Sequence, residues 1–135
     1  MSVRVRYKFE VAVSSTSAEE RDLGNKKHEI VSDGLGEGGT WKTKVPGATT
    51  DLEVTLRDVS DAKLLAISTN SVDQNQDPVA LDLKLNAIGA DPITIQPLSG
   101  TKKGNLLLTT TGLTALYLTN SGSVDMEVII TVAGD

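Results

Sequence analysis

Strict alternation of apolar and charged residues at the start of the chain constrains its fold more than any other feature. In VRVRYKFEVAV, residues 3–13, every second position is Val, Tyr or Phe, and Arg4, Arg6, Lys8 and Glu10 lie at positions between them. A period of two places alternate side chains on opposite faces of a β-strand. We therefore expect one strand about 36 Å long, at about 3.3 Å per residue, with its apolar face in a core.

The charged face of this strand has two interpretations. Charges along an edge strand protect it from pairing with other chains, so the face is either a solvated, protected edge or a docking surface. The strand is longer than a compact sandwich of this size needs. Its length supports a projecting end that pairs with a neighbouring protein or with a second copy of the chain.

The same period of two recurs in short runs separated by turn-forming pairs such as Pro46-Gly47 and Asp33-Gly34. Many short strands divided by turns are typical of an antiparallel β-sandwich, so the expected fold class is all-β. No linker divides the chain, and we expect a single domain over residues 1–135. The expected strands are residues 3–13, 27–32, 41–45, 51–57, 64–69, 79–85, 93–98, 105–109, 115–119 and 126–132.

One segment alone favours a helix. Ser17 to Glu20 has the spacing of a capping box, and Leu23 and Gly24 follow as a helical residue and a stop signal. The helix would have about two turns, which is marginal for an isolated helix. A charged surface loop fits the segment equally well.

Composition excludes several classes of protein. The chain has no cysteine, so disulfides, thiolate zinc sites and cysteine nucleophiles are excluded. Its net charge of −5 argues against binding to nucleic acid or to an anionic membrane. The first residues form no apolar leader, and no run of about 18 apolar residues occurs, so we expect a soluble protein made in the cytoplasm. Aromatic residues are 3% of the chain, which predicts an aliphatic core.

Two segments resemble ligand-binding motifs. SDGLGEGGTW holds Gly34, Gly36 and Gly39 in G-x-G-x-x-G spacing, but a strand and not a helix is expected after it, which favours a flexible loop. VDQNQDPVA alternates Asp73, Asn75 and Asp77 as a calcium loop does. That loop requires glycine at its sixth position and glutamate at its twelfth, and the chain has proline and lysine there. We expect no metal and no cofactor.

Residues suited to catalysis are few. His28 is the one histidine, and its neighbours in KKHEIV indicate a surface strand. No base and orienting group can be assigned to a serine or threonine nucleophile, so we expect no enzymatic activity. Trp41 is the one tryptophan and follows the glycine segment. It is interpreted either as a plug at one end of the core or as an anchor at a protein interface.

The C-terminal half resembles a known class of protein. DVSDAKLLAISTNSVDQNQDPVALDLKL followed by GLTALYLTNSGSVDMEVIITVAGD is similar to the β-sandwich cement or decoration proteins that coat the heads of tailed bacteriophages. In those proteins an aliphatic strand with a short polar exit leads to a hairpin. The resemblance covers residues from about 58 onward and rests on strand pattern, without a catalytic motif.

The resemblance implies a jelly-roll-like sandwich on the outer surface of a virion, where it bridges neighbouring major capsid subunits. Its partners would be the major capsid protein and itself, with a dimer favoured and a trimer as the alternative. The candidate interface residues are Arg4, Arg6, Lys8 and Trp41. The alternatives are a neck, tail or fibre-attachment protein of a virion, and a sandwich that binds carbohydrate or calcium.

Overall fold

The computed structural model describes residues 3–14, 22–70 and 78–135. These residues form ten β-strands and no helix, which confirms the all-β class. Each of the ten expected strands has an observed counterpart. The strands are β1 (Val3–Ser14), β2 (Asp22–Leu35), β3 (Glu37–Val45), β4 (Thr49–Thr55), β5 (Ala62–Asn70), β6 (Leu81–Leu85), β7 (Ile93–Ile95), β8 (Lys103–Leu113), β9 (Ala115–Asn120) and β10 (Met126–Gly134).

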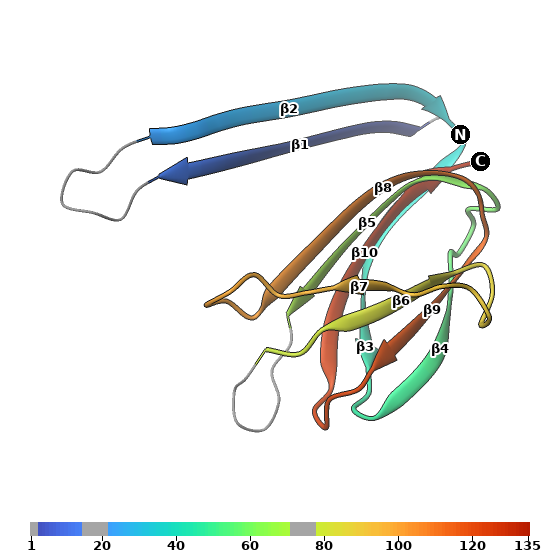
Figure 1. Ribbon diagram of the computed structural model, residues 1–135. Coiled ribbons are helices and arrows are strands. Elements are labelled where there is room, and N and C mark those ends of the chain that lie inside the picture. Colours follow the sequence, from blue (N-terminus) through green and yellow to red (C-terminus); the bar gives the residue numbers. More distant parts are fainter. Residues whose placement is uncertain (1–2, 15–21, 71–77) are drawn as a thin grey trace.

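Eight strands form two antiparallel four-stranded sheets (Figure 1). The first sheet has the order β3-β10-β5-β8 and the second has the order β4-β9-β6-β7. Four nested pairs explain both orders: β3 pairs with β10, β4 with β9, β5 with β8 and β6 with β7. One long hairpin folded across two sheets gives this pattern, which is the topology of a jelly roll. The expected jelly-roll-like sandwich is therefore confirmed.

The core between the sheets is aliphatic, as the composition predicts. Alternate residues of β10, from Met126 to Val132, are at most 1% exposed, and Leu116 and Leu118 of β9 are fully buried. Leu65 and Ile67 of β5 complete the contact from the first sheet. A period of two thus puts one row of each strand into the core and leaves the other row outside.

Strands β1 and β2 form a separate two-stranded hairpin, which we call the arm. In Figure 1 the arm leaves the sandwich beside the C-terminus, and its free end diverges from β8. The expectation that the first strand contributes to the sandwich core is therefore wrong, because β1 pairs with β2 and lies outside both sheets. Alternation specifies an apolar face but not the surface that covers it.

The glycine segment does not form the expected loop. Strand β2 continues through Gly34 to Leu35, a bend at Gly36 follows, and Gly39 lies inside β3. The turn expected at Asp33-Gly34 is likewise absent, since both residues are in β2. In the segment expected as a helix or a loop, Leu23 and Gly24 lie in β2, while residues 17–20 lie outside the described residues.

The root of the arm packs on the outer face of the first sheet. A Cβ added to Gly38 would lie 3.4 Å from Val3 Cγ1 of β1, so strands β1 and β3 approach closely there. Ala133 of β10 is opposite Gly38, and Leu64 of β5 is opposite Ala133. Both are buried, although neither belongs to the core between the sheets. The arm is therefore anchored at its root.

A buried asparagine holds one end of the sandwich together. Asn120 Nδ2 donates to the carbonyl of Val45 at 3.1 Å and to that of Val124 at 2.9 Å. Its Oδ1 accepts from the Gly122 N–H at 3.0 Å. The side chain is 1% exposed and joins the end of β3 to the turn between β9 and β10. Each of its three polar contacts replaces a hydrogen bond to water.

Asn120→Ala is expected to lower the free energy of unfolding by about 2 kcal/mol, because it removes two donors and an acceptor from buried backbone groups. Urea unfolding followed by Trp41 fluorescence measures this change. The matched control is Asn105→Ala on the exposed face of β8, for which we expect a loss below about 0.5 kcal/mol. Equal losses for both variants would contradict the role given to Asn120.

Candidate interaction surfaces

The arm presents alternating residues along β1. Arg4, Arg6 and Lys8 are exposed, while Val3 and Val5 are half-buried. Strand β1 pairs with β2 along one side, and no other strand of the described chain pairs with its second side. The arm therefore offers a row of exposed cations and a side that no second described strand covers.

Trp41 lies in β3 and packs against the core from the side where β3 and β4 form the sheet edges. It is half-buried, and the guanidinium of Arg57 stacks 4.6 Å from its ring centroid. This placement agrees with the plug interpretation. Trp41 and the three cations of β1 belong to different sheets, and whether they share an interface stays a prediction.

Arg57 has a strained backbone conformation in the turn that follows β4. Its φ is +57°, in the left-handed region that residues with a Cβ rarely occupy. Such a conformation costs about 1 kcal/mol, and a cation over an indole ring returns a comparable amount. Trp41 and Arg57 together cover part of the β3/β4 side of the sandwich, where a hollow of about 480 Å³ remains.

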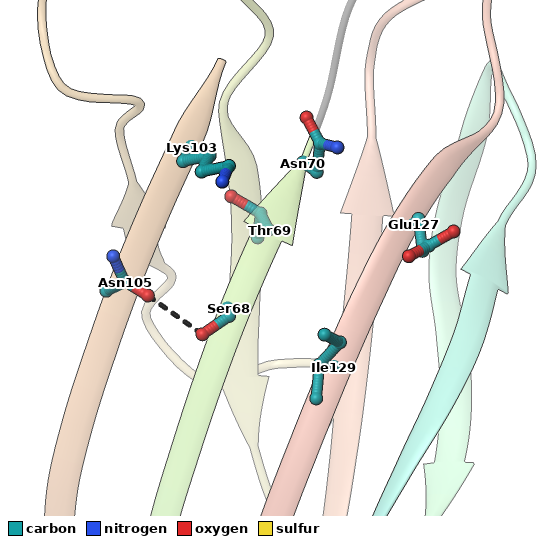
Figure 2. A pocket seen from close by; sticks show the side chains of 7 residues that line it. All are labelled: Ser68, Thr69, Asn70, Lys103, Asn105, Glu127 and Ile129. Atoms are coloured by element: carbon teal, nitrogen blue, oxygen red, sulfur yellow. Dashed lines mark hydrogen bonds between the residues drawn. The ribbon is translucent and has the colours of Figure 1, made fainter. Parts of the chain in front are cut away.

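A polar hollow of about 360 Å³ lies across β5, β8 and β10 on the outer face of the first sheet (Figure 2). Ser68 Oγ donates to Asn105 Oδ1 at 2.8 Å in its floor. Lys103 supplies a cation, and Glu127 supplies a carboxylate that pairs with Lys42 Nζ at 3.3 Å. The hydroxyl, amide and charged side chains that line this hollow can form hydrogen bonds and ion pairs with a polar partner.

The outer side of β8 is a surface that the sequence analysis missed. Strand β8 lies at the edge of the first sheet, and Leu107 on its outer face is 37% exposed. Leu106 and Leu108 face the core but are only half-buried. The sequence did hold a signal, since residues 104–114 contain no charge and no proline. A period of two alone predicts the strand but not its position at an edge.

The end of β8 is fixed by a charged pair at the start of β5. Lys63 Nζ donates to Asp61 Oδ2, and the Gly112 N–H donates to Asp61 Oδ1 at 2.7 Å. The hydrogen bonds from Lys63 and from Gly112 lower the pKa of Asp61, and the same carboxylate raises the pKa of Lys63. The ionised pair therefore fixes one end of the β8 edge.

The described residues contain neither a metal-binding cluster nor a membrane-spanning helix. Asp73, Asn75 and Asp77 lie outside the described residues, so the structure does not test that loop. Elsewhere, the described ranges hold no cluster of three or more acidic, histidine or cysteine residues suited to a metal ion. Within the same ranges, no helix has the length and apolar character needed to cross a bilayer.

The comparisons with known proteins give only weak structural similarity. No family model and no curated protein matches the sequence. Among solved structures, the chain is similar to one from Bacillus endospore appendages, described as a novel family of disulfide-linked pili, with 16% identity and a TM-score of 0.40. The alignment covers 74% of this chain and 91% of the other. We base no conclusion on a similarity at this level.

The strain at Arg57 predicts a difference between two substitutions that both remove the guanidinium. Arg57→Gly should leave the protein about 1 kcal/mol more stable than Arg57→Ala, because glycine accepts a φ of +57° without a steric cost. Urea unfolding of the two variants gives the difference directly. An alanine variant at least as stable as the glycine variant would contradict the strained conformation.

Proposed function

We propose that this chain is a structural subunit of a virus particle, a cement protein that binds the outer surface of a tailed-phage head and stabilises contacts between major capsid subunits. The observation that carries the proposal is the combination of a jelly-roll sandwich with an anchored, projecting arm. A cement protein has to contact two neighbouring subunits. A sandwich seated on one subunit and an arm of about 40 Å reaching the next would meet that need.

The charges support a position outside the shell. The chain has a net charge of −5, so packaged DNA would repel it. On β1 the sign is reversed, since Arg4, Arg6 and Lys8 outnumber Glu10. Such a local excess of cations favours an encounter with an acidic surface and gives the contact its orientation more than its strength. In this proposal the arm binds a carboxylate-rich patch of the major capsid protein.

In this proposal the overall affinity for the shell comes from many weak contacts acting together. Copies held on a repeating shell reach each other and the shell at a high effective concentration, so no single contact has to be tight. The chain would bind its capsid partner and itself, with a dimer as the favoured oligomer and a trimer as the alternative. It would be made in the host cytoplasm and act on the virion surface, without catalysis and without a cofactor.

The polar hollow of Figure 2 favours a second candidate function, a sandwich that binds carbohydrate. Lys103, Asn105, Ser68 and Glu127 supply the donors and acceptors that a sugar requires. A rise in melting temperature with a sugar would support this function. The first candidate takes precedence because it uses the arm as well as the sandwich.

Binding to capsids tests the proposal directly. Wild-type protein should co-sediment with empty, expanded heads that lack it, and deletion of residues 2–6 should weaken binding. A triple change, Arg4→Gln, Arg6→Gln and Lys8→Gln, should raise the apparent Kd more than about tenfold, an effect that increases at low salt.

The matched control removes three cations from the sandwich instead: Lys42→Gln, Lys44→Gln and Lys102→Gln. We expect its apparent Kd to stay within about threefold of the wild type. Failure of the folded wild-type protein to co-sediment would remove the cement proposal. If wild-type and arm variants bound equally, the cement proposal would stand without a role for the arm.

A further inference from the structure

The four edge strands of the sandwich differ in how they are protected from pairing with other chains. Strand β3 carries Glu37, Lys42 and Lys44. Strand β4 carries Asp51 and Glu53 and has a register irregularity between Thr49 and Leu52. Strand β7 has three residues and lies between Pro92 and Pro97. Charge, bulges, proline and short length are the features that prevent unwanted pairing of an edge.

Strand β8 has one of these features, a register irregularity in its pairing with β5 between Thr109 and Leu113, but it pairs regularly over residues 103–109. It is eleven residues long, its one charged residue is Lys103 at the start, and Leu106 to Thr111 form an unbroken run of leucines and threonines. No described strand pairs with its outer side. A long, uncharged edge with high β-propensity is a template for another strand.

The core-facing leucines of β8 remain partly exposed at this edge. Leu106 is opposite Ile67, and Leu108 is opposite Leu65. The β5 residues are at most 1% exposed, whereas their neighbours on β8 are half-buried. One more strand beside β8 would cover the exposed flanks of both leucines and remove apolar surface from water.

We propose that the open edge of β8 accepts β1 from the arm of a second copy of this chain, which extends the first sheet by two strands. The lengths are compatible, since β1 pairs regularly over residues 5–13 and β8 over residues 103–109. No described strand pairs with the second side of β1, because β2 occupies only one side. In Figure 1 the free end of the arm diverges from β8 of its own chain, so the arm that reaches this edge comes from another copy.

The alternation of β1 fits the two faces of β8. An added strand shares the pleat of its neighbour, so its apolar row would continue the core-facing row of Leu106 and Leu108. Its charged row, with Arg4, Arg6 and Lys8, would continue the outer row that contains Asn105, Leu107 and Thr109. The pairing therefore covers the leucines without burying a charge. Reciprocal exchange of arms closes a dimer, and exchange in one direction gives a ring or a chain.

This inference deepens the self-association part of the proposed function and requires no capsid. It is tested with purified protein alone, so its outcome is separate from that of the capsid experiment. Sedimentation velocity over a range of concentrations should show reversible association of the wild type. Leu107→Lys, at an exposed position of the open edge, should raise the Kd of association at least tenfold.

The control is Thr55→Lys, an exposed position on the charged and irregular edge of β4, which should change that Kd less than twofold. Melting curves verify that both variants are folded. A wild type that stays monomeric at all concentrations would overturn the proposal, as would equal effects of the two lysines.

Disulfide trapping identifies the strand that occupies the edge, because the natural chain has no cysteine. Chains with one cysteine on the arm, at Arg4, Arg6 or Lys8, are mixed with chains that have one on β8, at Asn105, Leu107 or Thr109. Opposed positions on paired strands bring Cβ atoms to about 5 Å, close to disulfide geometry. We expect a disulfide-linked mixed dimer in at least one of the nine mixtures. No mixed product, or crosslinks between β8 cysteines only, would overturn the arm as the occupant.

Discussion

Backbone groups along the edge of a β-sheet need hydrogen-bond partners, and this requirement organises the whole molecule. In the first sheet the last strand, β10, is inserted between β3 and β5, so two early strands become neighbours of the C-terminus. In the second sheet β9 performs the same role between β4 and β6. The four remaining edge strands are β3, β8, β4 and β7. Their length, charge and regularity determine whether another strand can pair with them.

The two lateral sides of the sandwich differ in the charge of their edge strands. On the β3/β4 side Trp41 packs against the core with Arg57 stacked on its ring, and charged residues occupy both edge strands. On the β7/β8 side the leucines of β8 retain exposed surface. The same chain carries an arm whose apolar residues alternate with cations. The charges on β3 and β4 disfavour pairing with another strand, whereas the nearly uncharged edge of β8 allows the sheet to continue into a neighbouring molecule.

The sequence predicted the strands well because a period of two is a local property. Leu116 and Leu118 are buried as their spacing requires, and Met126 to Val132 supply a core row. The sheet that each strand joins is not determined by its local sequence. The alternation of residues 3–13 is the same in an arm as in a sandwich, so the position of β1 outside both sheets was not predictable from it. Gly34 and Gly36 suggested a loop because glycine composition does not distinguish a loop from a bend between two strands.

The candidate site was predictable only in part for the same reason. Arg4, Arg6 and Lys8 are exposed, as expected from charged residues at alternate positions. The β8 edge depends on sheet order, which joins Leu106 and Leu108 to β5 on one side and leaves the other side open. Sheet order results from contacts between residues far apart in the sequence, such as Leu65 with Leu108. A single sequence does not reveal such pairs.

Hydrogen exchange at the amides of β1 and β8 tests the central claim most directly, which is that these two edges are completed by assembly. In dilute protein, alternate amides along residues 104–112 should exchange fast because they face away from β5, and the outward amides of β1 should behave likewise. At concentrations where the protein associates, both sets should become protected together. Association that leaves the amides of β8 as fast as in the dilute protein would contradict the account.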